Sequence, residues 1–324
     1  MRDPGLPKGL GDQMAAVARL VHAARLSSSM PLFRRKPTPP KRDVPPQTTA
    51  GVDSANDDLD WLGFDDVAEQ YARVQAPQHA AVAADLVQLL EMKQGARVLD
   101  VGSGTGAAAR AAAHAGGPDG LVIGVDPSVP MLQQARREGQ ARYAAARAID
   151  LPFRDATFAG ATACFVLGAL PNYRTALFEI LRVIAPGGRF GTATWAPGDD
   201  QDEFSRTWRE AAEQFAEHEM MREARDRALP WEDLFSDRDR AKDALHEAGL
   251  RDIWVEKRNY RFATNRSDYL ASREVTAQGR FLRHMLGDEF WGTFRGRVEA
   301  LFAERFPENF NDFREAVLIV GHKP

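Results

Sequence analysis

The stretch that decides the fold is Arg97–Arg110, which reads RVLDVGSGTGAAAR. Its first five residues are mostly apolar or β-favouring and contain no breaker, so they predict a strand. Three alternating glycines follow, and then a run of alanines, the residue that most favours a helix. Glycines permit positive φ and close approach to a ligand, and a helix start offers unpaired N–H groups. The stretch therefore predicts a binding site for a small ligand, first of all a nucleotide derivative.

Strand and helix patterns alternate beyond the turn. Strands are predicted at Leu121–Asp126, within Ala144–Phe153, within Phe158–Leu170 and ending at Trp195, with helices between them that include Met131–Tyr143. Repeated units of strand and helix predict an α/β fold with a parallel, doubly wound Rossmann-like sheet.

The order of elements changes beyond Pro197. Helical stretches at Gln201–Ala228 and Asp237–Ala248 precede a strand near residues 252–262, and a long, mostly helical segment leads to a last strand at Arg314–Lys323. A strand reached through such an excursion is expected to be an antiparallel edge strand.

The first sixty residues differ in kind from the rest. Gln13–Leu26 could form an amphipathic helix, but Ser27–Asp58 is rich in Pro, Ser, Thr and charge and cannot bury a core. We expect residues 1–60 to be a disordered or weakly helical tail. Residues 61–324 are predicted to form one domain, with a core at 94–196 and helical lid elements at 201–235 and 263–312.

Composition limits the classes of function. The 324 residues are 44% hydrophobic and 27% charged, with a net charge of −4. These values are ordinary for a soluble globular protein and argue against a general nucleic-acid binder. The single cysteine, Cys164, excludes intrachain disulfides and multi-cysteine zinc sites. No run approaches the roughly eighteen apolar residues of a membrane span. We therefore expect a cytoplasmic protein with no nucleic-acid partner, no membrane span and no metal site; an organelle-import role for the acid-poor tail is the weaker alternative.

The glycine pattern alone leaves two ligand classes open, dinucleotides and S-adenosylmethionine. Asp126, about twenty residues past the turn, would accept hydrogen bonds from the ribose of either ligand. Asp100, two residues before the first glycine, favours S-adenosylmethionine, because its carboxylate would repel a pyrophosphate and suit a sulfonium and an ammonium. A nicotinamide-dependent oxidoreductase is the alternative from another enzyme class.

Four motifs add a resemblance to this physical argument. VLDVGSGTG, VIGVDPSVPML, LPFRDATFAGATACFVL and LRVIAPGGRF stand in the order and spacing of class I S-adenosylmethionine-dependent methyltransferases. The chain most resembles the small-molecule group that includes the ubiquinone/menaquinone-type methyltransferases. This resemblance implies a seven-stranded sheet with an antiparallel last strand, S-adenosylmethionine as cofactor, and methyl transfer to a small, largely apolar metabolite.

The resemblance also implies roles for individual residues. Asp100 and the backbone of the turn would hold the methionine end, Asp126 the ribose, and Phe165 would border the sulfonium while Tyr71 covers the cofactor. The full set of expected cofactor-binding residues is Tyr71, Asp100, Gly102, Ser103, Gly104, Thr105, Gly106, Asp126, Pro127, Met131, Ala148, Ile149 and Phe165. Arg147 stands where family members often carry an acid for the adenine amino group, which leaves adenine recognition to Pro127, Met131 and the backbone of Ala148 and Ile149.

The acceptor side is less defined by sequence. Apolar residues at spacings of three and four between Phe281 and Phe302 form an amphipathic stripe, which is either plain core or a lid over an apolar acceptor. Trp195, Trp208 and Trp231 would join such a lid.

No general base is predicted. The segment after the fourth strand has no titratable group, and His218, His246 and His284 are expected to be surface residues. Alignment alone can support methyl transfer from an activated sulfonium. A methyltransferase-fold protein that binds the cofactor but serves as a non-catalytic partner or regulator therefore remains an alternative.

Overall fold

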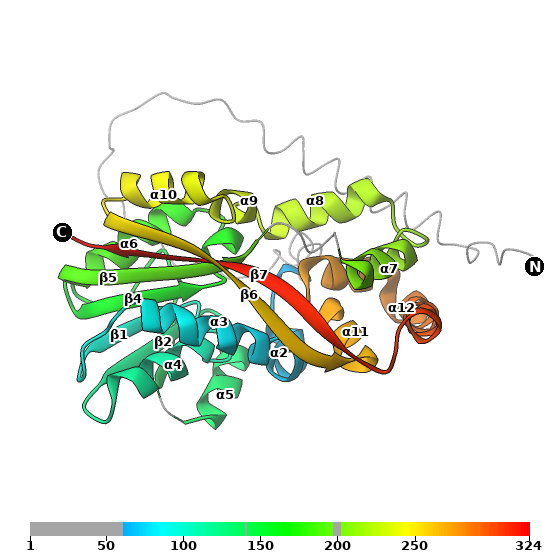
Figure 1. The fold of residues 1–324 in the computed structure, drawn as a ribbon, viewed down its shortest axis with the longest axis horizontal. Helices are drawn as coiled ribbons and strands as arrows, with labels where there is room; N and C mark the ends of the chain where they lie inside the picture. Colours follow the sequence, from blue (N-terminus) through cyan, green and yellow to red (C-terminus); the bar gives the residue numbers. More distant parts are fainter. Residues whose placement is uncertain (1–60, 140, 197–201) are drawn as a thin grey trace, which may run out of the picture.

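The structure is a computed structural model that describes residues 61–139, 141–196 and 202–324 (Figure 1). The predicted tail at residues 1–60 lies outside this range. One mixed sheet has the strand order β3-β2-β1-β4-β5-β7-β6. Its strands are β1 (Arg97–Val101), β2 (Leu121–Asp126), β3 (Arg142–Ala145), β4 (Phe158–Cys164), β5 (Ile184–Trp195), β6 (Arg251–Asn265) and β7 (Asn309–His322). The first five strands run parallel, and β7 runs antiparallel to both neighbours, which confirms the predicted Rossmann-like fold.

The helices alternate with the parallel strands and then dominate the second half of the chain. They are η2 (Asp65–Val67), α2 (Ala68–Val74), α3 (Ala76–Leu89), α4 (Ala107–Gly116), α5 (Val129–Arg137), η3 (Leu167–Ala169), α6 (Tyr173–Val183), α7 (Glu203–Ala212), α8 (His218–Ala228), α9 (Glu232–Phe235), α10 (Arg238–Glu247), α11 (Arg266–Glu274) and α12 (Ala277–Arg305). Side chains of α3 cover one face of the sheet, and those of α6 and α10 cover the other.

Two expectations about the sheet are wrong in detail. The helix predicted at Met131–Tyr143 ends at Arg137, because Gly139 adopts φ +73 and the chain turns back into β3. The last strand is not the edge: β7 lies between β5 and β6, and β6 is the edge strand. Consecutive residues of β7 such as Val317 and Leu318 are fully buried, the pattern of a strand covered on both faces.

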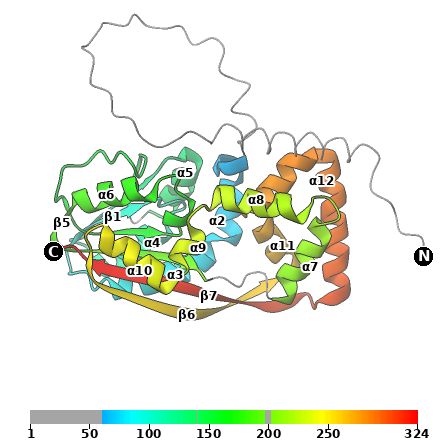
Figure 2. The ribbon, with the colours of Figure 1, turned by 90° about the horizontal axis from the view of Figure 1, so that it is seen from above.

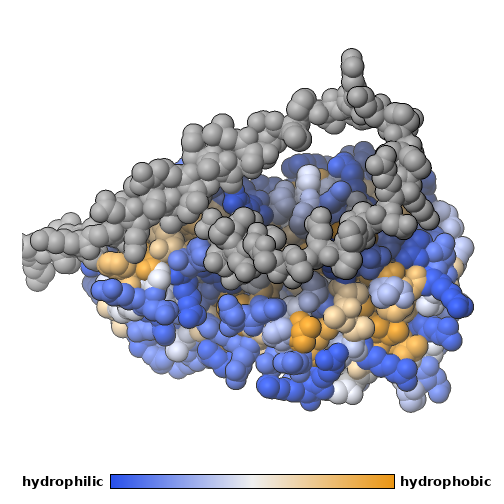
Figure 3. Space-filling view, turned by 180° about the vertical axis from the view of Figure 1, so that it is seen from behind, coloured by the Kyte–Doolittle hydropathy of each residue, from blue (hydrophilic) through white to orange (hydrophobic). Residues whose placement is uncertain are grey.

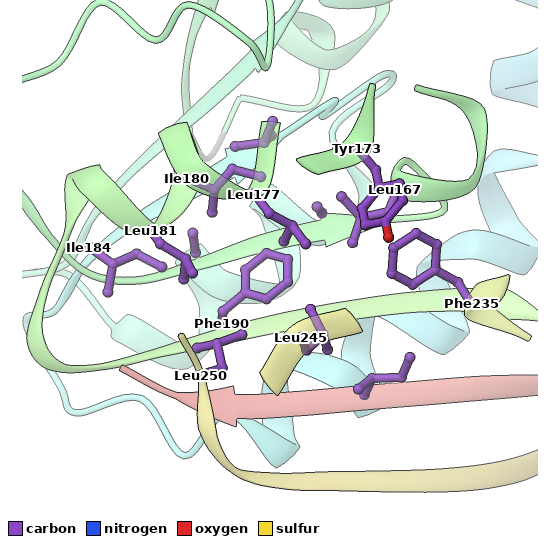
Figure 4. Close-up of a cluster of buried hydrophobic side chains, with 14 of the residues drawn as sticks. Leu167, Tyr173, Leu177, Ile180, Leu181, Ile184, Phe190, Phe235, Leu245 and Leu250 are labelled. Atoms are coloured by element: carbon purple, nitrogen blue, oxygen red, sulfur yellow. The ribbon is translucent and has the colours of Figure 1, made fainter. Parts of the chain in front are cut away.

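The larger core lies between the sheet and the α6–α10 layer. Figure 4 shows Leu177 and Ile180 of α6 and Leu245 of α10 converging on Phe190 of β5. All four side chains are fully buried. Their contacts hold β4 and β5 in place, so the ends of these strands are fixed where a ligand would bind.

A second core belongs to the helical half of the molecule. Figure 2 shows α7, α8, α11 and α12 grouped beside the sheet, with β6 and β7 running from the sheet toward them. The predicted stripe on α12 is part of this core: eight of its side chains are buried, Phe281, Leu282, Met285, Leu286, Trp291, Phe294, Val298 and Phe302. The stripe is thus core, and a lid function for these helices stays a prediction.

The surface has no single dominant apolar face in the view of Figure 3, where hydrophobic patches alternate with hydrophilic residues. Among the described residues, no helix combines the length and apolar character that crossing a bilayer requires.

Replacing Phe190 with alanine should lower the free energy of unfolding by about 3–5 kcal/mol, since it deletes a fully buried ring from the core. The matched control is Phe178→Ala on α6, whose residue is 69% exposed and should change stability by less than about 0.5 kcal/mol. Urea titrations of both variants measure the difference. Equal losses would contradict this placement of the core.

Candidate functional site

The glycine turn between β1 and α4 has three glycines with positive φ: Gly102 at +64, Gly104 at +51 and Gly106 at +84. A Cβ on Gly102 would lie 2.4 Å from a methyl of Val166, and one on Gly106 would lie 2.4 Å from the Tyr143 hydroxyl. Among the described residues, a Cβ on Gly104 would meet nothing within 4 Å. Two glycines are thus required by packing, whereas Gly104 faces open space where a ligand can approach the backbone.

Asp126, at the end of β2, closes the turn from the side. Its Oδ2 accepts a hydrogen bond from Gly104 N at 2.9 Å, and its Oδ1 accepts one from Ser128 N at 2.8 Å. Burial raises the pKa of this carboxyl, and the two N–H donors oppose that rise. Each oxygen keeps a second lone pair, so the carboxylate can still accept a hydrogen bond from a ligand hydroxyl.

Asp100 is buried beneath the turn. Its Oδ2 accepts a hydrogen bond from Ala109 N in the first turn of α4 at 2.9 Å, and its Oδ1 accepts one from the Thr162 hydroxyl of β4 at 2.7 Å. Desolvation raises the pKa of the carboxyl to about 7 despite these donors. Asp100 therefore fixes β1, β4 and α4 to one another, and the predicted contact with the methionine end stays a prediction.

This placement also changes the charge argument drawn from the sequence. A carboxyl whose pKa lies near 7, and whose oxygens bond to α4 and β4, repels a pyrophosphate less than an exposed carboxylate would. Asp100 alone therefore does not decide between a dinucleotide and S-adenosylmethionine.

Ser103 and Thr105 stabilise the turn mainly through hydrogen bonds of their backbone atoms. Ser103 N donates to Val125 O at 2.9 Å, and its buried hydroxyl has no hydrogen-bond partner. Thr105 is buried and its carbonyl accepts from Arg110 at 2.6 Å. Both residues hold the turn in shape behind its open glycine.

The expected adenine side lies at the ends of β2 and β3. Met131 is buried at the start of α5, and Pro127 is exposed beside Asp126. Residues 147–150 form a tight turn in which Asp150 N donates to Arg147 O at 3.1 Å. Ile149, 36% exposed, lies in this turn next to the half-buried Ala148, so an apolar side chain is open to a ligand here.

An aromatic cluster lies at the ends of β4 and β5. Phe165 follows β4 with φ +60, a conformation that bulky residues rarely adopt and that is typical of functional sites. Its ring stacks on His79 at 4.1 Å between centroids and lies 4.7 Å from Trp195. The Tyr71 hydroxyl and His79 Nδ1 are 2.6 Å apart. The structure thus brings Tyr71 and Phe165 together through His79.

His79 is the site residue that sequence reasoning missed. It sits on α3 eight residues after Tyr71, and this spacing of about two helical turns was the available signal. Burial, with a smaller contribution from the charge of Arg314, lowers the pKa of His79 to about 3. The imidazole is therefore neutral at physiological pH. His218, His246 and His284 are exposed, as expected.

A family model described as a methyltransferase domain matches residues 99–192. This segment is therefore similar to a methyltransferase domain. It begins in β1 and ends in β5, so it contains the glycine turn, Asp126 and Phe165.

Curated relatives support the same assignment. A demethylmenaquinone methyltransferase of Symbiobacterium thermophilum is 36% identical over 138 residues, 39% of this chain and 55% of the relative. One of Geobacillus kaustophilus is 35% identical over 135 residues, 39% of this chain and 58% of the relative. The chain thus spans little more than half the length of these relatives. The resemblance to menaquinone-type class I methyltransferases is confirmed for this segment.

The chain also aligns with a solved structure. Phosphoethanolamine N-methyltransferase 2 of Haemonchus contortus, in complex with S-adenosyl-L-methionine, aligns with a TM-score of 0.49 at 20% identity. The alignment covers 85% of this chain and 61% of that one.

Asp100→Asn should flatten part of the pH dependence of stability. Between pH 5 and 7 the folded protein holds more protons on Asp100 than the unfolded chain, so this group makes stability fall by roughly 2 kcal/mol as pH rises. Asparagine can accept from Ala109 and donate to Thr162 without titrating. The measurement is the unfolding free energy of both proteins at pH 5 and 7.

The exposed Asp119→Asn variant is the matched control for this comparison, and it should keep the wild-type pH dependence. Identical pH dependence of Asp100→Asn and wild type would show that Asp100 is ionised in the folded protein at pH 5.

Proposed function

We propose that this protein transfers a methyl group from S-adenosylmethionine to a small, largely apolar acceptor. The observation that carries the proposal is the pairing of the Asp126 carboxylate with Gly104 N inside the segment that matches a methyltransferase domain. It presents an acceptor for ribose hydroxyls directly beside the one turn glycine that is open to a ligand.

The residues present fit S-adenosylmethionine. Asp126 would hold the ribose, and Gly104 would let the methionine end approach the turn at the start of α4. Ile149 would lie against the adenine, because it offers an exposed apolar side chain at the end of the neighbouring strand. Phe165 and Tyr71 would border the sulfonium from β4 and α2. When bound, S-adenosylmethionine supplies a methyl group already activated by the sulfonium.

The chain's own residues would act on the acceptor by alignment. Phe165 and Trp195 offer aromatic surface that excludes water and orients a flat, apolar acceptor. His79 is held by Tyr71 at Nδ1, and within the described residues its Nε2 has no hydrogen-bond partner. With a pKa near 3 the imidazole is too weak a base to take a proton efficiently at neutral pH. It can instead accept or donate a hydrogen bond at Nε2 and fix the acceptor's direction.

The relatives are named for demethylmenaquinone, which makes this compound in its reduced form the first acceptor to try. The aromatic cluster and the apolar character of the expected acceptor agree with a ring of this kind.

Calorimetry of the purified protein should show micromolar binding of S-adenosylmethionine and S-adenosylhomocysteine, and none of NAD. Asp126→Asn should weaken both adenosyl ligands at least tenfold, about 1.4 kcal/mol, because the amide NH₂ would face a backbone N–H in place of an oxygen. Asp119→Asn, an exposed change of the same charge, should leave both affinities unaltered.

Binding of NAD alone would overturn the proposal. Binding of the adenosyl ligands without turnover on any acceptor would replace it with the non-catalytic partner role.

His79 should stay neutral down to about pH 4. Its lowered pKa places the protonation of the ring far below the ordinary imidazole value, about 6.5. Histidine ring NMR between pH 4 and 8, with the resonance assigned by His79→Gln, measures this directly. A midpoint between pH 6 and 7 would make His79 a general base and contradict the alignment role.

A further inference from the structure

Arg273 on α11 is a buried arginine with an unusual environment. The residue is 4% exposed, and its guanidinium lies over the ring of Trp208, 5.2 Å from the centroid. Its Nε is buried without a hydrogen-bond partner. Within residues 61–139, 141–196 and 202–324, no carboxylate is within ion-pair distance of it. A guanidinium nitrogen that is buried without a partner loses hydration that no hydrogen bond replaces.

Two other buried arginines of this fold have hydrogen bonds that compensate for the hydration they lose. Arg280 on α12 also lies over an aromatic ring, but it donates to Trp61 O at 2.8 Å and to Val275 O at 2.6 Å. Arg314 on β7 donates to the Asp312 carboxylate at 2.8 Å. Among these three guanidinium groups, only that of Arg273 has no such hydrogen bond.

Two carboxylates near Tyr269, which lies one helical turn before Arg273, already have partners. Burial raises the pKa of the Tyr269 hydroxyl, one turn before Arg273, to about 12, and the charges of Asp202 and Asp312 add to this while that of Arg273 opposes it. Asp312 pairs with Arg314, and Asp202 accepts from Ser205 N at 2.8 Å in the cap of α7. Neither carboxylate neutralises Arg273 by a direct contact.

A second unpaired polar group lies at another contact of α11. Gln75, at the start of α3, donates through Nε2 to Ser272 O at 3.1 Å, and Ser272 directly precedes Arg273. Gln75 is 5% exposed, and its Oε1 is buried without a partner. Buried polar groups of a folded protein are seldom left unpaired, so a ligand could supply the hydrogen bond that each of these two side chains lacks.

Contacts lead from Arg273 to the aromatic cluster. The Asp312–Arg314 pair lies close enough for Asp312 to act on Tyr269. The Arg314 guanidinium lies 5.3 Å from the centroid of Trp195, whose ring contacts Phe165 and His79. β7 thus has side chains both near Tyr269, one helical turn from Arg273, and against Trp195 of the aromatic cluster.

We propose that Arg273 binds an acidic group of the methyl acceptor, a carboxylate in the first instance, while the acceptor's aromatic ring reaches toward Phe165. The guanidinium has the planar donor edge that suits a carboxylate. That the bound anion is the methyl acceptor rests on the proposed function. That Arg273 binds an anion does not depend on it. The anion site thus adds an acidic group to the otherwise largely apolar acceptor of the proposed function.

The test uses 2-naphthoate and its neutral isostere 2-naphthamide, titrated calorimetrically into the full-length protein with and without saturating S-adenosylhomocysteine. Wild type should bind the naphthoate at least tenfold more tightly than the amide. Arg273→Met should abolish this preference, and Arg273→Lys should keep part of it. The variants should bind S-adenosylhomocysteine as wild type does.

Thermal unfolding separates binding from a structural role. Arg273→Met should leave the Tm unchanged or raise it, because an unpaired buried charge is replaced by an apolar side chain of similar length. Arg280→Met is the matched control and should lower the Tm, because it removes hydrogen bonds to Trp61 and Val275, yet keep the naphthoate preference.

Equal binding of naphthoate and naphthamide, no binding of either, or a preference that survives in Arg273→Met would overturn the anion site. Failure of S-adenosylhomocysteine to bind would instead count against the proposed function, since the naphthoate comparison can be read without it.

Discussion

The Asp100 carboxylate is the contact on which the rest of the site depends. A parallel sheet needs β1 and β4 side by side, and a glycine turn needs the first turn of α4 to stay in place behind it. Asp100 bonds to Ala109 of α4 and Thr162 of β4, and so meets both needs with one buried group. The cost is desolvation, which raises its pKa to about 7. With the turn fixed, Asp126 can hold Gly104 at the open end of the sheet.

The helical half is tied to this sheet through the first described helices and the two long strands. Gln70 of α2 donates to Ala271 O at 2.9 Å and to Glu274 at 3.0 Å, and the Ser128 hydroxyl before α5 donates to Asp65 at 2.6 Å. The segment that carries Tyr71 therefore touches both the start of α5 and α11. A movement of α11 would therefore displace Tyr71 and, through the hydrogen bond between Tyr71 and His79, also His79.

The charged and titratable groups around the aromatic cluster differ in how they are compensated. His79 is kept neutral by burial and by the nearby charge of Arg314, so it can orient a ligand without repelling a cation. Arg314 is itself neutralised by Asp312, whereas Arg273 lies against the Trp208 ring and has no ion pair within the described residues. Aromatic rings and the Arg273 guanidinium together are the environment that we propose for a flat, acidic acceptor.

The sequence by itself determined the parallel sheet, the glycine turn and the position of Asp126, because each is encoded by neighbouring residues in a short pattern. It could not decide that β7 lies inside the sheet or that Asp100 bonds inward to Thr162, since both depend on which strands become neighbours. The stacking of His79 on Phe165 and the isolation of Arg273 were decided by the tertiary structure alone. Residues so far apart in the chain come into contact only when the helices have packed against the sheet. Short sequence patterns do not predict that packing.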